Sequence, residues 1–416
     1  MSPKIGLRVR EHDHTYDAIV VGGRVAGSTA AAILGEHGQR VLLVERVRFP
    51  RPTISTHFFR GEGLVAVLDR LQVLDEVLAL GPPPLRREWS FGFGGPGPDE
   101  GPPQGPGDAG FSLSVRRSPL DDLLLRRAAR TPGVDLAQPA AVVRLLWEDG
   151  RVVGARLRDG DGERDVRSRV VVGADGRHSL VAREVAPAVE HEVEALRTLY
   201  YRYVSGWRGP AGEPPDAAEF ALNGDEIAYV FPSEAGVACI GVSAPSSDFA
   251  AFRAAPDAEL DRRVRAHHPG LADRWIAARP VGRPAGGPPE PSWVRAPAGP
   301  GWALVGDAAV HQDPWTGAGM DTAGRHAVIA AEAIACPSWR RPSQSRMASR
   351  MASITSTVSG PSVHSATRPT CRRRSSSVVA GSSQCRHEIS VICPSWAIVI
   401  AKLPRWSTRP GPPALR

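Results

Sequence analysis

Short apolar runs of strand length recur along this chain, and the first of them are separated by a helical pattern. Residues 16–21 (YDAIVV) and 40–46 (RVLLVER) read as buried strands, and the segment 28–38 between them (STAAAILGEHG) has the small and apolar residues of a buried helix that ends at Gly38. Two further apolar runs cover 168–173 and 302–306. Strand, helix and strand in this order predict a β-α-β unit with parallel strands.

A different pattern fills residues 190–295. Stretches at 197–207, 218–232 and 236–245 alternate or run apolar over strand lengths and are separated by turn residues, which predicts an antiparallel sheet. Residues 257–278 then read as one or two helices. We therefore expect a second domain, inserted between the elements of the first.

The turn after the first strand almost matches a dinucleotide-binding pattern. Residues 20–28 read VVGGRVAGS, with Arg24 where G-x-G-x-x-G has its second glycine. Gly22 permits a tight exit from the strand, and Gly27 lets the helix pack closely, so that the helix N-terminus can face a pyrophosphate. Glu45 ends the second strand, where a carboxylate can accept hydrogen bonds from the adenosine ribose. Together these features predict an adenine dinucleotide site.

Arg24 leaves two interpretations open at this stage. Its guanidinium can donate charge-assisted hydrogen bonds to the phosphates or to a nearby ribose. It can equally point to solvent and be only tolerated.

Two later motifs decide which dinucleotide is expected. Residues 168–183 (SRVVVGADGRHSLVAR) give a strand that ends in a Gly-Ala-Asp-Gly turn, and residues 302–323 (WALVGDAAVHQDPWTGAGMDTA) give a strand followed by Gly-Asp and a proline- and glycine-containing turn before a helix. With the first glycine turn, these motifs resemble the FAD-dependent monooxygenase superfamily typified by para-hydroxybenzoate hydroxylase, which also includes geranylgeranyl-reductase-like oxidoreductases. The resemblance runs from about residue 16 to 335. Within it, Arg117, Leu120 and Leu124 match the superfamily's R-x-x-L-x-x-x-L helix.

The resemblance implies an α/β fold, in which a Rossmann-like FAD-binding domain of the three-layer ββα type carries an inserted antiparallel-sheet substrate domain. It implies FAD as the cofactor and NAD(P)H as a transient reductant, and it places the chain in a subgroup with a G-x-R-x-A-G-S turn. No catalytic residue is assigned, and the sequence shows no metal-ligand cluster. The residues expected to bind the cofactor are Gly22, Arg24, Gly27, Glu45, Arg46, Arg117, Asp175, Gly306, Asp307, Pro314, Gly317 and Gly319.

Some of these residues have a simpler alternative. Asp307 is expected to accept hydrogen bonds from the ribityl hydroxyls, but it could be an ordinary helix cap, and Asp175 could serve only the turn that contains it. The chain also departs from the superfamily pattern at two positions. Asp321 stands where Asn is common, and His311 sits one place later than usual.

The expected domain division follows from these motifs. Residues 15–80, 111–189 and 296–335 form a discontinuous FAD-binding domain, and 190–295 form the substrate domain. Residues 81–110 are rich in Pro and Gly and are expected to be a loop. Residues 336–416 are rich in Ser and Arg and are expected to be disordered, or to result from a change of reading frame near Ala335.

Residues on the substrate side carry weaker signals. His57, in a segment that passes near the flavin in the superfamily, is a candidate acid or base, but a packed histidine is the simpler interpretation. Tyr200, Tyr201, Tyr203 and Trp207 could line an aromatic pocket or belong to the core of a strand.

Composition changes this picture only at the C-terminal end. The net charge is +7, yet residues 336–416 hold thirteen Arg or Lys and one acid, so the preceding 335 residues carry 7 minus 12, or −5. The basic character therefore gives no reason to expect nucleic-acid binding by the folded part. Five cysteines show no metal-ligand spacing, and no apolar run of about 18 residues suggests a membrane helix.

The expected function is that of an FAD-dependent oxidoreductase in the cytoplasm, acting on a small-molecule substrate without a nucleic-acid or membrane partner. An NAD(P)H-dependent monooxygenase that hydroxylates or epoxidises an organic substrate is the leading hypothesis. A flavin-dependent reductase of isoprenoid C=C bonds and an inactive flavin-binding remnant are the alternatives.

Overall fold

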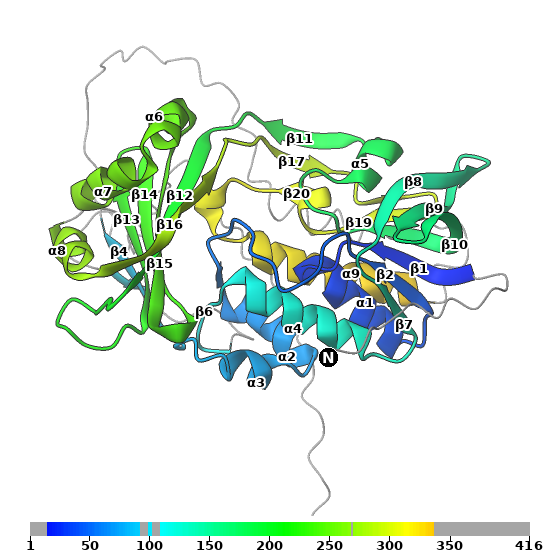
Figure 1. The fold of residues 1–416 in the computed structure, drawn as a ribbon, viewed down its shortest axis with the longest axis horizontal. Helices are drawn as coiled ribbons and strands as arrows, with labels where there is room; N and C mark the ends of the chain where they lie inside the picture. Colours follow the sequence, from blue (N-terminus) through cyan, green and yellow to red (C-terminus); the bar gives the residue numbers. More distant parts are fainter. Residues whose placement is uncertain (1–14, 92–98, 102–108, 268, 337–416) are drawn as a thin grey trace, which may run out of the picture. The chain divides into compact units, whose positions relative to one another are not determined.

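A parallel sheet forms the centre of the first half of the fold. The computed structural model describes residues 15–91, 99–101, 109–267 and 269–336 (Figure 1). In the central sheet β1 pairs in parallel with β2 and β10, and β10 pairs in parallel with β19. The order of its strands is β18 (Ala298–Gly299), β19 (Trp302–Leu304), β10 (Gly162–Gly173), β1 (Thr15–Val21), β2 (Val41–Val44) and β7 (Val134–Ala137).

Alternate residues of these strands serve two hydrophobic cores. Ala18 and Val20 of β1 face a cluster that contains the helices, whereas Ile19 and Val21 face a second cluster on the other side of the sheet. This alternation is the period-2 geometry of a strand that is buried on both faces. It explains why the sequence of β1 is apolar at consecutive positions.

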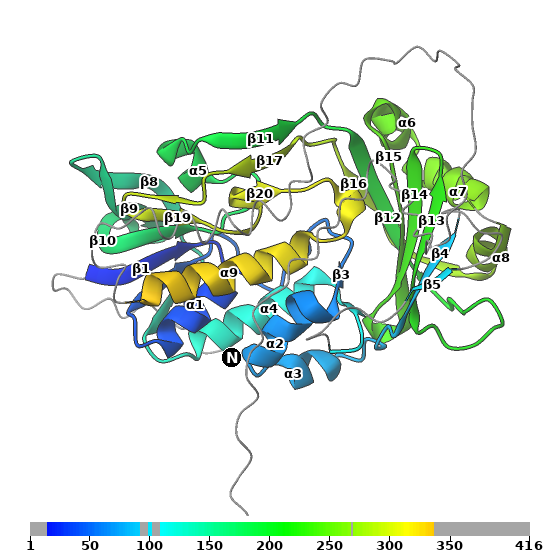
Figure 2. The same cartoon turned by 180° about the vertical axis from the view of Figure 1, so that it is seen from behind.

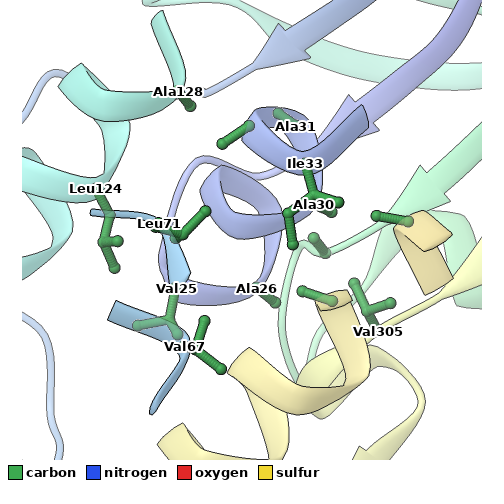
Figure 3. Close-up of a cluster of buried hydrophobic side chains, with 14 of the residues drawn as sticks. Val25, Ala26, Ala30, Ala31, Ile33, Val67, Leu71, Leu124, Ala128 and Val305 are labelled. Atoms are coloured by element: carbon green, nitrogen blue, oxygen red, sulfur yellow. The ribbon is translucent and has the colours of Figure 1, made fainter. Parts of the chain in front are cut away.

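Helices cover the first face. Helix α1 (Val25–Glu36) packs against α4 (Arg117–Ala129) and α9 (Gly319–Ala335), as both views show (Figures 1 and 2). Val25 and Ala26 of α1 belong to the same cluster as Val67 and Val305, which come from distant segments (Figure 3). The small side chains of α1 let these helices approach closely. Two short helices, α2 (Ala66–Arg70) and α3 (Leu74–Leu78), complete this layer.

The opposite face is covered by an antiparallel hairpin, β8 (Ala141–Glu148) and β9 (Arg151–Asp159), whose second strand pairs with β10, and by helix α5 (Leu180–Val185). Helices, parallel sheet and hairpin are the three layers of a ββα arrangement. The predicted fold class is therefore confirmed.

A second sheet is mostly antiparallel and contains the strands predicted between residues 197 and 245. Helices α6 (Phe249–Ala254), α7 (Pro256–His267) and α8 (Pro269–Ala277) pack on one of its faces. The order of its strands is β16 (Arg279–Gly287), β12 (Arg197–Ser205), β15 (Val237–Pro245), β14 (Glu226–Pro232), β13 (Ala217–Asn223), β4 (Arg87–Phe91) and β5 (Asp99–Gly101).

The loop prediction for 81–110 is wrong where β4 and β5 pair at one edge of this sheet. Trp89 and Phe91 are buried there, so two aromatic side chains at alternate positions outweigh the surrounding Pro and Gly residues. Strand β16 was not predicted either. It contains Pro280 and Pro284, which an edge strand tolerates.

Smaller elements connect the two sheets. The strands β11 (Val189–Val193), β17 (Ser292–Arg295) and β20 (Val310–His311) form a three-stranded sheet, and β3 (Phe58–Phe59) pairs with β6 (Leu113–Ser114). The π-helix η1 (Gly61–Val65) precedes α2. Short 3₁₀ turns are η2 (Glu234–Gly236), η3 (Ser246–Asp248), η4 (Gly306–Ala308) and η5 (Pro314–Thr316).

The predicted domain boundaries stay a prediction, because β11 and β17 pair across the two ends of the segment 190–295. The prediction for 336–416 lies outside the described residues, apart from Cys336. Among the helices that the structure describes, none is long and apolar enough to cross a membrane.

Candidate functional site

The carboxyl ends of the parallel strands bring the three sequence motifs together. The motif backbones are joined by hydrogen bonds there: Ala174 N donates to Val21 O, and Gly22 N donates to Val44 O, both at 2.8 Å. The third motif joins through Val305 N, which donates to the carbonyl of the last residue of β10 at 2.9 Å. This edge is where ligands bind in open α/β sheets. Residues far apart in the sequence thus form one candidate site.

The glycine turn leaves no room for side chains at its two strict positions. Gly22 has φ +103°, and a Cβ there would lie 2.5 Å from Ala174 O. A Cβ on Gly27 would lie 1.7 Å from Gly22 O. Helix α1 therefore begins directly against the turn, with first-turn N–H groups that have no partner within the helix and no acidic residue among them. This cradle fits the diphosphate of FAD.

Glu45 forms a hydrogen bond with the backbone of the glycine turn. The carboxylate is buried, and its oxygens accept hydrogen bonds from Gly23 N at 2.7 Å and Val47 N at 2.9 Å. Each carboxylate oxygen has capacity for a further donor, so these bonds are compatible with ribose binding. The expected role of Glu45 stays a prediction, as does that of the neighbouring Arg46, which is exposed.

Arg24 does not point freely into solvent. Its Nη1 lies 2.5 Å from Asp121 Oδ2, and its guanidinium lies over the Phe49 ring at 5.3 Å from the centroid. Asp121 Oδ1 also accepts a hydrogen bond from Arg117 Nε at 3.0 Å. The structure thus brings together two of the predicted arginines. The carboxylate between them was not predicted, although its i, i+4 spacing from Arg117 was a visible signal.

The carboxylate of Asp175 caps helix α5. It accepts hydrogen bonds from the Ser179 hydroxyl at 2.5 Å and from Leu180 N at 2.7 Å. Burial raises the pKa of Asp175 against these bonds. These contacts agree with the simpler interpretation of a turn residue, and a part in cofactor binding stays a prediction.

Asp307 follows β19 in the turn η4. Burial raises the pKa of Asp307, and electrostatic interactions with His311, Arg117 and Arg177 oppose this shift. Gly306, with φ +59°, provides the left-handed backbone that precedes it. Because β19 runs parallel to β10 and β1, Asp307 lies at the same edge of the sheet as the glycine turn.

The turn before α9 and the start of α9 contain the predicted cofactor-binding residues Pro314, Gly317 and Gly319. Asp313 caps η5, in which Pro314 is the first residue, and Gly317 adopts φ +59°. A Cβ on Gly319, the first residue of α9, would meet no described atom within 4 Å. The helix N-terminus is thus open to a ligand, where its dipole would stabilise an anionic reduced flavin.

Asp321 links the start of α9 to the segment that contains His57. Its Oδ1 accepts hydrogen bonds from Leu64 N at 2.8 Å and Arg60 N at 3.1 Å, and its Oδ2 lies 3.7 Å from Arg60 Nη1. Burial raises the pKa of Asp321 to about 6, with Arg60 and these hydrogen bonds opposing the shift. A Cβ on Gly63 would lie 2.1 Å from Oδ1, so glycine makes this contact possible.

The second sheet presents an aromatic face opposite its helices. Alternate residues of β12, β14 and β15 point away from α6, α7 and α8, and this face meets His57 and Phe58. Phe58 stacks on Phe231 at 4.5 Å between centroids and lies beside Gly317. The aromatic face consists of Tyr201, Tyr203, Phe220, Tyr229 and Phe231. Tyr200 packs on the other face, against Phe252, and Trp207 is also in the helix-side core.

His57 is the polar centre of this region. It is 1% exposed, and its Nε2 lies 2.6 Å from the Tyr203 hydroxyl. Burial, followed by the charges of Arg117 and Arg116, lowers the pKa of His57 to about 3, so the ring is neutral at physiological pH. Burial also raises the pKa of Tyr203. The pair is therefore a neutral hydrogen-bond donor and acceptor in a dry environment.

Two features of His57 point to more than packing. Its backbone has φ +65°, which is unfavourable for a residue other than glycine, and its Nδ1 has no hydrogen-bond partner among the described residues. Strain and an unpaired buried polar atom are typical of functional positions. In the part of the chain that the structure describes, no group of three or more His, Cys, Asp or Glu residues could hold a metal ion.

Comparisons with known proteins identify the family of this chain. Residues 15–204 match the family model of the FAD binding domain. The chain is 30% identical over 328 residues to digeranylgeranylglycerophospholipid reductase of Thermoplasma volcanium, covering 74% of this chain and 75% of that enzyme.

Solved structures share the fold. The myxobacterial chondrochloren halogenase CndH, a FAD-dependent halogenase, is 27% identical with a TM-score of 0.71, over 81% of this chain and 78% of that one. PqsL of Pseudomonas aeruginosa, solved with 2-aminobenzoylacetate, is 22% identical with a TM-score of 0.66, over 82% and 92% of the two chains, and shows the fold alone. The chain therefore belongs to the superfamily of FAD-dependent monooxygenases and geranylgeranyl-reductase-like enzymes, and it is an FAD-dependent oxidoreductase.

Proposed function

We propose that the protein is an NAD(P)H-dependent FAD monooxygenase that hydroxylates or epoxidises a small organic substrate held against the aromatic face. The observation that carries this proposal is the buried His57–Tyr203 pair, 2.6 Å apart, with an unpaired Nδ1. FAD, when bound, supplies the redox chemistry: once reduced by NAD(P)H, it activates O₂. One oxygen atom enters the substrate and the other leaves as water.

The His57–Tyr203 pair favours a substrate with a polar group. Buried donors and acceptors without a partner are costly, so a ligand hydroxyl, amine or carbonyl that pairs with them gains affinity and orientation. The surrounding side chains are aromatic and favour a flat, apolar remainder of the substrate. A purely hydrocarbon segment would leave His57 Nδ1 without a partner.

The aromatic face also keeps water away. Phe58 and Phe231 stack between the segment that contains His57 and the sheet, and both are almost fully buried. Oxygen transfer by a reduced flavin needs a positioned substrate and a dry site rather than a protein nucleophile. The buried side chains of the aromatic face would provide such a dry site.

The proposal is tested by comparing cofactor oxidation with and without oxygen. Purified protein loaded with FAD is mixed with NADH or NADPH and a panel of small aromatic and alkene substrates. A monooxygenase oxidises NAD(P)H in air with uptake of O₂ and transfers ¹⁸O from ¹⁸O₂ to the product. Product formed equally well without oxygen would contradict the proposal, and FAD binding with no turnover in either condition would favour an inactive remnant.

A substitution of Tyr203 can be compared with a matched control substitution on the same strand. Tyr203→Phe removes the hydroxyl that pairs with His57, and we expect turnover of the best panel substrate to fall by about 10²-fold while FAD stays bound. Tyr200→Phe, on the helix-side face of β12, should change turnover less than about twofold. Equal turnover of both variants and the wild type would remove the pair from the reaction.

A second candidate is a flavin-dependent reductase of isoprenoid C=C bonds. The named relative from Thermoplasma volcanium, at 30% identity over three quarters of both chains, favours it. Anaerobic incubation of FAD-loaded, dithionite-reduced protein with digeranylgeranylglycerophospholipid separates the two. Saturation of the prenyl chains, detected by mass spectrometry, would establish the reductase in place of the monooxygenase.

A further inference from the structure

We infer that Asp121 is a positioning residue of the FAD site, whose carboxylate holds Arg24 and Arg117 as one unit beside the start of α1. This inference rests on FAD binding by the chain and not on the monooxygenase proposal. Arg24, the unusual residue of the glycine turn, thereby has a fixed partner, and its guanidinium has a fixed direction.

The Asp121 carboxylate bridges the two arginines. The Asp121 side chain is fully buried, and each of its oxygens meets a different arginine, Oδ2 with Arg24 Nη1 at 2.5 Å and Oδ1 with Arg117 Nε at 3.0 Å. A buried carboxylate is tolerated only when it is paired, and removing one partner leaves an uncompensated charge. Because α1 and α4 are packed together, the bridge links their N-terminal ends.

The bridge limits the positions of both arginines. The Arg24 guanidinium contacts both the Asp121 carboxylate and the Phe49 ring. Arg24 and Arg117 remain 29% and 13% exposed, so each guanidinium keeps donors that the carboxylate does not use. Those donors are fixed in direction, which reduces the entropy lost when they bind an anion.

The backbone explains why an arginine is possible at this point of the turn. Arg24 has φ −84° and ψ −164°, extended values that any residue adopts. The absence of the second glycine therefore costs no backbone strain. Arg24 replaces a close backbone approach with a guanidinium held by Asp121.

Two opposing effects decide the role of Asp121. As a bare charge, the carboxylate repels the anionic diphosphate, so its removal would strengthen FAD binding. As a positioning residue, it orders two cations, so its removal would weaken binding. Arg24, Arg117 and Asp121 together carry a formal charge of +1. The ordering of the two arginines outweighs the repulsion between Asp121 and the diphosphate.

The test is FAD affinity, measured by quenching of flavin fluorescence on FAD-free full-length protein. Asp121→Asn should raise the Kd for FAD by at least about tenfold. The matched control is Asp122→Asn, which changes the adjacent carboxylate, paired with Arg126 on the same helix, and should change Kd less than about twofold. An unchanged or lower Kd for Asp121→Asn would overturn the inference.

A double-mutant cycle separates positioning from stability. Once Arg24→Ala has removed one partner, Asp121→Asn should raise Kd by a smaller factor than it does in the wild type, because the bridge is already broken. Equal factors in both backgrounds would overturn the coupling. If Asp121→Asn does not fold, Asp121→Glu keeps the charge but moves the carboxylate, and it too should weaken FAD binding by about tenfold; wild-type affinity in a folded Asp121→Glu protein would also overturn the inference.

Discussion

At the scale of single residues, the glycine turn separates positions that require glycine from one that does not. Gly22 requires it for its positive φ and Gly27 for the closeness of the Gly22 carbonyl, whereas Arg24 has an ordinary extended backbone. The sequence predicted the first two correctly from the pattern alone, since their reasons are local. The partner of Arg24 comes from α4, 97 residues away, and no local pattern could supply it.

Gly27→Ala is the sharpest test of the turn. The added methyl group would lie 1.7 Å from Gly22 O, so the turn or the helix start must move. We expect a loss of about 1–3 kcal/mol in the free energy of unfolding and at least a tenfold rise in the Kd for FAD, about the effect of one lost charge-assisted contact. Urea unfolding and flavin fluorescence measure the two effects.

Gly160→Ala is the control for that substitution. A Cβ there meets no described atom within 4 Å, so neither stability nor FAD affinity should change. Similar FAD affinity in both variants and the wild type would mean that the turn does not hold the cofactor.

At the level of secondary-structure elements, hydrogen bonds between α9 and the segment around η1 hold the candidate site together. Asp321 on α9 accepts hydrogen bonds from the backbone of Arg60 and Leu64, and so links the segment after His57 to the start of α9. Asp321 was recognisable in the sequence as a departure from the superfamily, but its contacts were not predictable because they join residues more than 250 positions apart. The β-α-β unit, by contrast, was predictable, because its periodicity and turn are contiguous.

The errors at this scale have a common cause. Strands β4 and β5 lie in a Pro- and Gly-rich segment, and β16 contains prolines, so local composition argued against strands. Pairing with β13 and β12 stabilises them nonetheless. Edge strands gain their stability from the neighbouring strand, which the local sequence does not reveal.

Asp321→Asn should change how stability depends on pH. The folded-state pKa is raised from 3.8 to about 6, so the folded protein keeps a proton that the unfolded chain loses between these values. The stability from Asp321 is therefore complete below about pH 4 and is lost as the pH rises through 6. Asn keeps an acceptor for both backbone donors and does not titrate.

Urea unfolding at pH 5 and pH 8 measures this difference. The stability of Asp321→Asn relative to the wild type should rise between the two pH values by on the order of 1–2 kcal/mol. Asp69→Asn, an exposed carboxylate on α2, serves as the control and should show no such rise. A pH-independent difference for Asp321→Asn would place its carboxylate in an unperturbed environment.

At the level of the whole molecule, the proposed function draws on both sheets. The parallel sheet and the helices packed on it supply the glycine turn, the bridge at Asp121 and the start of α9, and the second sheet supplies the aromatic face with Tyr203. The sequence indicated each half, yet it left His57 and the tyrosines as ambiguous core or site residues. The contact between His57 and Tyr203, from segments 146 residues apart, is not visible in the sequence, and it is the basis on which we propose that the pair belongs to the site.

Titration of the FAD-free, full-length protein with FAD measures whether the carboxyl edge of the parallel sheet binds this cofactor. The carboxyl edge of the parallel sheet, with Gly22, Gly27 and Glu45, should bind FAD in an equimolar complex, with quenched flavin fluorescence and a structured absorbance band. We expect this complex in the wild type and an at least tenfold higher Kd in a folded Gly27→Ala protein. A folded wild-type protein that binds no FAD, or a Gly27→Ala protein that binds FAD equally well, would contradict the account.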